Sequence, residues 1–392
     1  MRRRELLQSA VLPLLVGCGG MPVVPKSDQQ IRVASFNVSL YDSDAGGVIK
    51  RLQQGDSKAA QAAKVIRHQR PDLLLVNEFD YDPGEVAADL FQRQYLESAN
   101  GIGDPITYPY RYLAPVNTGV ASGLDIDGDG RADGPQDAWG FGTHPGQYGM
   151  LVLSRFPIDL GQIRSFQHFR WSQMPSAMRP RWPDGREYYS DAIWQQLRLS
   201  SKSHWDLPVV TPLGTVNFLV SHPTPPVFDG PENRNGCRNH DELRLWADYL
   251  DSTKGSYLVD DQGRKGATAD DATVVIAGDL NADPFDGDAG DGIRLLHASP
   301  RLNDAYTPIS RGGALAAQSQ QGNNRTQRGD PAADTGDFND NGPGNLRVDH
   351  VIPSVDLSVV DGGVFWPAPG EVGADWLDGS DHRMVWMDLT RR

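Results

Sequence analysis

Short apolar runs rich in Val, Ile and Leu recur along the chain, and several of them end abruptly in polar residues. Residues 273–277 (TVVIA) are followed at once by residues 278–284 (GDLNADP), a sequence typical of a buried strand that ends in a turn. Period-two alternation predicts that Asp279 and Asn281 share one face of this strand end, while Leu280 points into the core. An ordinary polar turn would leave the same pattern, so its interpretation depends on the other runs.

The N-terminal part of the chain repeats this pattern. Residues 31–38 alternate and predict a strand that carries Asn37 near its end. Residues 59–70 have the apolar spacing of a helix, and residues 73–76 predict a buried strand that leads directly to Glu78. The order strand, helix, strand is typical of a βαβ-like layered unit.

The C-terminal half combines further strands with long polar stretches. Residues 193–199 have a strand pattern that suits a meander, whereas residues 286–345 contain few apolar positions and predict loops. The predicted strands carry polar groups at or near their ends: His222 after residues 216–220, Asp349 and His350 within residues 344–353, and Asp381 and His382 before residues 384–389.

Glu78 is the residue in this set that most needs a partner. A carboxylate at the end of an apolar strand is costly to bury alone, and a bound cation offsets that cost. An exposed Glu in a surface loop is the simpler alternative. The sequence therefore predicts a cation at Glu78 if its strand end lies inside the fold.

Residues 101–147, rich in Gly, Asp and Pro, include a second acidic pattern. Carboxylates at spacing two around a Gly resemble the front part of a calcium-binding EF-hand loop, but Gln136 stands where the closing Glu of such a loop belongs. We therefore expect a calcium-stabilised loop rather than a full EF-hand, with a solvated acidic turn as the alternative. The predicted calcium ligands are Asp125, Asp127, Asp129 and Asp133.

Composition limits the class of partner. The 392 residues include 37 Lys and Arg against 51 Asp and Glu, a net charge of −14, with 39% hydrophobic residues. These values are typical of a folded globular protein. The negative charge argues against tight binding of duplex DNA, because the phosphate backbone is repelled.

The N-terminus reads as an export signal. Three arginines at positions 2–4 precede an apolar stretch, residues 6–16, that is too short to span a bilayer. Residues 15–18 resemble a bacterial lipobox, in which Cys18 becomes the lipidated residue, and the arginines resemble a twin-arginine motif. We expect a signal over residues 1–18, a tether over residues 19–30 and an exported lipoprotein anchored in a membrane, periplasmic or at the cell surface. An ordinary cleaved signal is the alternative.

The motifs NEFD, SHP, GDLNADP and SDHRMVW, in this order, resemble the endonuclease/exonuclease/phosphatase superfamily over roughly residues 31–390. That superfamily includes secreted DNases, abasic-site endonucleases, sphingomyelinases and inositol-phosphate phosphatases. The resemblance implies an α/β four-layer sandwich in which two mixed sheets pack face to face with helices outside. Residues 31–392 would form one catalytic domain with insertions near 101–147 and 286–345.

The resemblance also implies roles for the residues at the strand ends. A divalent cation, Mg²⁺ or Mn²⁺, would be held by the metal ligands Asn37, Glu78 and Asp381. Among the catalytic residues, Asp279 would orient or deprotonate water, and Asn281 would position the water or the phosphate. His222 and His382 would donate hydrogen bonds to the phosphoryl oxygens or protonate the leaving group. Asp349 would orient His382.

Two positions depart from the pattern of the superfamily. Ser39 stands where some members carry an acidic residue, so one or two metals remain open. His350 stands where an aromatic residue is more common, and it is interpreted as a packing residue.

The function implied is metal-dependent hydrolysis of a phosphoester substrate outside the cytoplasm, for example in phosphate scavenging. Nucleic acid, nucleotide, phospholipid and sugar phosphate all remain open as substrates, as does the choice between monoester and diester. The alternatives are a secreted nuclease acting on DNA or RNA, and a non-enzymatic, calcium-stabilised surface lipoprotein that binds a partner. The sequence does not indicate an oligomeric state.

The lipobox interpretation predicts how the protein fractionates. The wild-type protein should partition with membranes, whereas Cys18→Ala should yield an unprocessed or soluble form, because the acylated side chain is lost. Cell fractionation of the two proteins tests this. Recovery of both as identical soluble proteins would show that residues 15–18 are not a lipobox.

Overall fold

Two large sheets form the centre of the molecule in the computed structural model, which describes residues 29–99, 102–287 and 290–392. In spatial order, the first sheet contains six strands: β12 (Leu357–Val364), β13 (Val385–Arg391), β1 (Ile31–Leu40), β2 (Leu73–Phe79), β4 (Met150–Ser154) and β3 (Tyr110–Tyr112). The second contains five: β11 (Asp349–Pro353), β8 (Val274–Asp279), β7 (Gly214–Ser221), β6 (His204–Thr211) and β5 (Arg164–Ser165). A small separate pair consists of β9 (Gly336–Asp337) and β10 (Asn345–Leu346).

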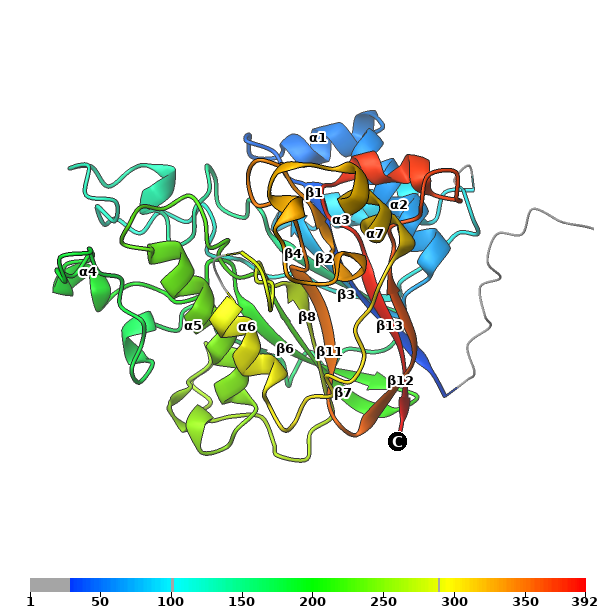
Figure 1. The fold of residues 1–392 in the computed structure, drawn as a ribbon. Coiled ribbons are helices and arrows are strands. Elements are labelled where there is room, and N and C mark those ends of the chain that lie inside the picture. The colour runs from blue at the N-terminus through cyan, green and yellow to red at the C-terminus, as the bar shows by residue number, and fades with distance from the viewer. Residues whose placement is uncertain (1–28, 100–101, 288–289) are drawn as a thin grey trace, which may run out of the picture.

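Both large sheets are mixed. Strands β1 and β2 are parallel, as are β7 and β8, and the other neighbours are antiparallel. Strand β1 lies between β2 and the last strand, β13, so the two ends of the described chain are neighbours in one sheet (Figure 1). The first sheet is therefore complete only when the C-terminal strand is in place.

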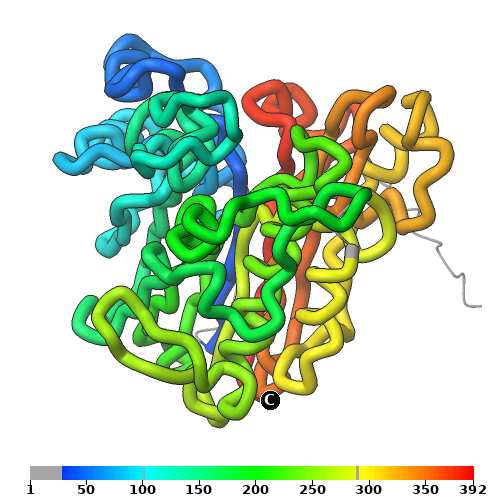
Figure 2. Tube along the Cα trace, turned by 90° about the vertical axis from the view of Figure 1, so that its left-hand side faces the viewer, coloured from blue at the N-terminus to red at the C-terminus, as the bar shows by residue number. Residues whose placement is uncertain are grey.

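Helices cover the outer faces of both sheets. The chain contains seven α-helices over the described residues: α1 (Gly47–Gln54), α2 (Ser57–Gln69), α3 (Val86–Leu90), α4 (Asp191–Trp194), α5 (Arg234–Tyr249), α6 (Gly290–His297) and α7 (Arg311–Ser319). Helices α1 to α3 pack on the first sheet, and α5 and α6 pack on the second. Figure 2 shows the blue and cyan N-terminal segments on one side of the molecule and the yellow and orange C-terminal segments on the other. The predicted four-layer α/β sandwich is confirmed.

Alternation along each strand assigns its side chains to one of three apolar clusters. In β1, Val33 faces the layer between the sheets, whereas Ala34 and Phe36 face the helices. In β8, Val275 and Ala277 face the same inner layer. The inner layer is thus built from every second residue of both sheets, as expected for two sheets packed face to face.

Helix α2 shows why the predicted helices form where they do. The Asp56 carboxylate caps its first turn by accepting a hydrogen bond from the backbone N–H of Ala59 at 2.8 Å. Residues at helical spacing, including Ala62, Ala63 and Ile66, are buried against the first sheet. The helix predicted over residues 59–70 is confirmed.

Two secondary-structure predictions are wrong. Residues 193–199 do not form a strand; helix α4, capped by Ser190, places Trp194 in the outer cluster of the second sheet. Residues 286–345 are not loops throughout, because they contain α6 and α7. In α6 the apolar Ile293 and Leu296 stand three residues apart and pack against α5, so a short stripe was enough to form a helix.

The predicted export signal, Cys18 and most of the predicted tether lie outside the described residues. Among residues 29–99, 102–287 and 290–392, no helix combines the length and the apolar character needed to cross a membrane.

Candidate active site

The inner-layer alternation continues past the apolar residues of each strand and places polar groups at one edge of the sandwich. Asn37 continues the inner face of β1, and Asp279 continues that of β8. His222 follows the inner-facing Val220, and Asp349 precedes the inner-facing Val351. Side chains from four strand ends therefore meet where the two sheets face each other.

Asp279 lies at the centre of this edge and is only 1% exposed. The Asn37 side-chain amide donates to Asp279 Oδ2 at 3.0 Å, and the Asp279 backbone N–H donates to Asn77 Oδ1 at 3.3 Å. Both partners belong to the opposite sheet. Burial raises the pKa of Asp279, which makes its carboxylate a better proton acceptor than an exposed Asp.

His382 reaches the same carboxylate from a loop before β13. Its Nδ1 lies 2.8 Å from Asp349 Oδ2, and its Nε2 lies 3.6 Å from Asp279 Oδ2. Burial opposes the imidazolium charge, but Asp349 and Asp279 outweigh it and raise the pKa of His382. His382 is therefore a charged hydrogen-bond donor at neutral pH, with its ring orientation set by Asp349.

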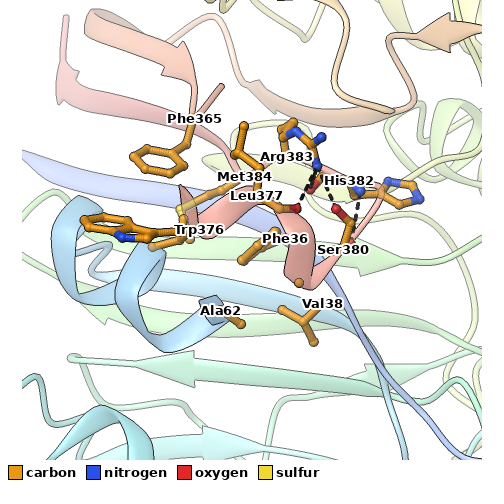
Figure 3. A pocket seen from close by; sticks show the side chains of 12 residues that line it. Phe36, Val38, Ala62, Phe365, Trp376, Leu377, Ser380, His382, Arg383 and Met384 are labelled. Atoms are coloured by element: carbon orange, nitrogen blue, oxygen red, sulfur yellow. Dashed lines mark hydrogen bonds between the residues drawn. The ribbon is translucent and has the colours of Figure 1, made fainter. Parts of the chain in front are cut away.

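The loop that carries His382 is fixed from behind. The Ser380 hydroxyl donates to the backbone oxygen of Asn37 at 2.8 Å and accepts from the His382 backbone N–H at 3.0 Å. Figure 3 shows Ser380, His382 and Arg383 along this loop, with Phe36 and Trp376 on its apolar side. The cavity there measures about 10 Å³, which is room for one water at most, so it is not a substrate pocket.

His222 differs from His382 in charge. Its Nε2 lies 3.4 Å from Asp279 Oδ2. Burial, together with the positive charges of Lys202 and His382, lowers the pKa of His222 well below its ordinary value. His222 is therefore a neutral imidazole, suited to donating a hydrogen bond rather than a proton.

Glu78 enters the site through an unusual backbone conformation. Strict alternation would point it toward the helices, because the preceding Asn77 faces the inner layer. Its φ of 54° breaks that alternation, and its carboxylate lies within 4.8 Å of ligand atoms of His222 and Asp279. Burial raises the pKa of Glu78, and the nearby Asp279 charge adds to this effect.

This donor set fits a small divalent cation. Glu78 and Asp279 are neighbouring carboxylates, and Glu78 forms no ion pair within the described part of the chain. Like charges this close repel each other unless a cation lies between them. The Asn37 amide oxygen accepts the Ser39 backbone N–H at 3.1 Å and keeps a second lone pair for a cation. Few carboxylates and such an amide oxygen are ligands that Mg²⁺ prefers alongside water and substrate.

The other predicted site residues take different positions. Asp381 is exposed, lies 3.5 Å from the Ser39 hydroxyl and is not part of the cluster around Glu78. Asn281, with φ 51°, donates through its side chain to the backbone oxygen of Pro223 at 3.1 Å, next to His222. His350 points away from the site and contacts the backbone oxygen of Ala282 through Nε2 at 2.9 Å.

The acidic loop forms a group of carboxylates of its own, which shares no residue with the groups around Asp279. Asp125, Asp127 and Asp129 bring one carboxylate oxygen each within 4.8 Å of one another. Asp133, the fourth predicted ligand, instead forms a bidentate ion pair with Arg131 at 3.0 and 3.1 Å. The structure thus gathers three of the four predicted ligands.

Lys202 and Glu242 also lie beside the site, although no motif pointed to them. Lys202 is buried close enough for its charge to act on Glu78, Asp279 and His222. Lys202 lies two residues before β6 and Glu242 lies within α5, and neither belongs to a recognisable motif. Glu242 comes from α5, and contacts with Glu242 and Asn117 hold the segment of Lys202, so the local sequence held no signal for either residue.

A family profile described as the Endonuclease/Exonuclease/phosphatase family matches residues 34–382. This match spans most of the chain and includes every strand that carries a predicted catalytic residue. The chain belongs to this family. Family members are phosphoesterases that use divalent metals such as Mg²⁺. No curated protein matches the sequence.

The chain is also similar to several solved structures. An endonuclease/exonuclease/phosphatase from Beutenbergia cavernae is 20% identical, with a TM-score of 0.50, and the match covers 93% of this chain and 72% of that one. A family protein from Bacteroides thetaiotaomicron is 12% identical, with a TM-score of 0.46 and coverage of 93% and 95%. Sphingomyelinase C from Streptomyces griseocarneus is 13% identical, with a TM-score of 0.46 and coverage of 92% and 99%.

The contact between Asp349 and His382 predicts a change in pH dependence. Asp349 is the main group that raises the pKa of His382, so Asp349→Asn should lower that pKa and bring the alkaline loss of activity to lower pH. An opposite charge at this distance is worth about 1–3 pH units. The pH profile of kcat/KM for phosphoester hydrolysis measures the shift.

The control for this experiment is His382→Gln, which should abolish the alkaline limb. Persistence of the limb in His382→Gln would assign it to another group. An unmoved limb in folded Asp349→Asn would contradict the role of Asp349.

Proposed function

We propose that this protein is a divalent-metal-dependent phosphoesterase that attacks a phosphoester with water. The observation that carries the proposal is the buried Asp279 carboxylate, which lies within 3.6 Å of both a neutral and a charged imidazole. One base and two hydrogen-bond donors of different charge are the groups that in-line hydrolysis of a phosphoester requires.

Each side chain has a distinct part in this proposal. Asp279 orients the attacking water and accepts its proton, helped by the raised pKa of its carboxylate. His222 donates a hydrogen bond to a phosphoryl oxygen. His382 donates to the phosphoryl group and gives its proton to the departing alkoxide, while Asp349 holds the ring in place. A divalent cation held by Glu78 and Asn37 would neutralise charge on the phosphoryl oxygens.

The substrate class follows from charge. The net charge of −14 opposes tight, salt-sensitive binding of a nucleic-acid duplex. Small phosphoesters, phospholipid head groups and single nucleotides need only the local site. We propose a phosphodiesterase or phosphatase that acts on such substrates. A nuclease with this net charge would have to act on nucleic-acid chains that it binds only weakly.

Export and anchoring complete the proposal. A lipobox at Cys18 would place the enzyme at a membrane surface outside the cytoplasm, where phosphate scavenging is useful. Calcium at Asp125, Asp127 and Asp129 would stabilise the long insertion without taking part in the chemistry. The support is the close approach of their carboxylates, in a group that shares no residue with the two groups around Asp279.

Removing the metal should abolish the activity. EDTA should reduce hydrolysis of a generic phosphodiester to background, and Mg²⁺ or Mn²⁺ should restore it. Glu78→Gln keeps the shape of the side chain and removes its charge, so it should need far more metal for the same rate. The rate as a function of metal concentration is the measurement.

A matched control is Glu97→Gln, because Glu97 lies outside the site and contacts Gln92. Full activity in EDTA, or an unchanged metal requirement in Glu78→Gln, would contradict the metal site.

Calcium should raise the melting temperature without changing kcat. A ligand that binds only the folded state stabilises it by about 2.7 kcal/mol at a hundredfold excess over Kd. Asp127→Ala should lose this stabilisation while keeping its Mg²⁺-dependent activity. Thermal melts in Ca²⁺ and in EGTA test this, and an equal shift in wild type and variant would place the calcium effect elsewhere.

A further inference from the structure

Lys202 is a buried cation beside the proposed catalytic groups. It lies two residues before β6 and is 6% exposed. Its ammonium group has no hydrogen bond or ion pair to any residue within the described ranges 29–99, 102–287 and 290–392. A buried charge without a partner is costly. The ammonium group of Lys202 is therefore suited to bind an anionic ligand.

The backbone around Lys202 is fixed next to His222. Glu242 of α5 is fully buried, and its two oxygens accept the backbone N–H groups of Ser201 and Thr224, both at 2.6 Å. The Ser201 hydroxyl also donates to the backbone oxygen of His222 at 3.3 Å. Both oxygens of Glu242 are thus engaged by backbone donors, and the segments that carry Lys202 and His222 are held side by side.

A second set of contacts fixes the segment from the other side. The Asn117 backbone N–H donates to the backbone oxygen of Lys202 at 3.0 Å. The Asn117 side-chain amide donates to the backbone oxygens of Ser200 at 2.8 Å and Gln167 at 2.7 Å. Asn117 is itself fully buried. Lys202 therefore starts from a rigid backbone, as a preorganised binding group requires.

The charge of Lys202 interacts with ionisable side chains from both sheets. Burial lowers the pKa of Lys202, while Glu242, Glu78 and Asp279 favour its charged form. In return, the positive charge of Lys202 lowers the pKa of His222. The ammonium group therefore lies within electrostatic reach of the proposed metal ligand, the proposed base and the neutral imidazole.

We propose that the Lys202 ammonium donates hydrogen bonds to a non-bridging oxygen of the substrate's phosphoryl group, which makes Lys202 a further catalytic residue. This inference rests on the proposed phosphoesterase function. Ser39 occupies the place of a possible second acidic metal ligand and bonds weakly to Ser380 at 3.4 Å. A fixed ammonium group supplies at this site the additional positive charge that a second cation would bring.

A purely structural role for Lys202 makes the opposite prediction for metal binding. If Lys202 only balances the charges of Glu78, Asp279 and Glu242, its loss should loosen the site and weaken the binding of both Mg²⁺ and phosphate. If Lys202 binds phosphate, its loss should weaken the binding of phosphate alone. Removal of a positive charge near Glu78 should leave Mg²⁺ binding unchanged or make it tighter, because the cation is repelled less.

The test compares Lys202→Met, which keeps the apolar stem, with wild type. Calorimetric titration of the full Mg²⁺-loaded protein with inorganic phosphate should give a Kd raised about 10- to 100-fold in the variant, the usual effect of losing a charged hydrogen bond. The Kd for Mg²⁺, measured separately, should stay the same or fall. Lys254→Met is the matched control, because the Lys254 side chain is 68% exposed and its ion pair is with Asp251, away from the site.

Lys202→Gln replaces Lys202→Met if the latter does not fold, and the same expectations hold. Unchanged phosphate affinity in a folded variant would overturn the role of Lys202 and leave the proposed function intact. If the Kd for Mg²⁺ and the Kd for phosphate both rise, the proposed contact with phosphate is wrong and Lys202 has a structural role. Failure of the wild type to bind phosphate in Mg²⁺ would overturn the proposed function itself.

Discussion

The edge where the two sheets meet is arranged around one carboxylate that both sheets share. Asp279 ends a strand of the second sheet, yet its side chain and its backbone N–H are bonded to Asn37 and Asn77 of the first. The two histidines approach the same oxygen from different segments. Burying a carboxylate costs free energy, and the hydrogen bonds and charges of these neighbours reduce that cost. The face-to-face packing of the sheets and the candidate chemistry are therefore two aspects of one arrangement.

Irregular backbone is concentrated at this edge. Ser39, Glu78 and Asn281 all adopt positive φ values, between 49° and 54°, although none of them is glycine. A residue held in this region costs on the order of 1–3 kcal/mol. Each of the three terminates or interrupts a strand just where a side chain must leave the regular alternation. The packed layers on both sides stabilise this conformation, so the site is built before any ligand arrives.

Much of this arrangement was predictable from the sequence. Alternation identified Asp279 as a strand-end residue opposite the buried Leu280, and the order of motifs indicated the family and its sandwich. The prediction for Glu78 rested on the cost of burying its charge and on the order of motifs, because strict alternation would turn its side chain away from the site. Lys202 was missed altogether, since only long-range contacts through Glu242 and Asn117 bring it there. The local periodicity of strands and helices, about two to four residues, carries no information about contacts between residues far apart in the sequence.

The pairing of β1 with β13 fixes where the two ends of the described chain lie. The Thr390 hydroxyl bonds to the backbone oxygen of Gln29 at 3.2 Å, so both ends meet at one pole (Figure 1). Asn37 lies six residues beyond Ile31, the first residue of β1, or about 20 Å further along the strand. A support attached at either end would therefore hold the molecule by its base, with the reactive edge turned toward the open solution.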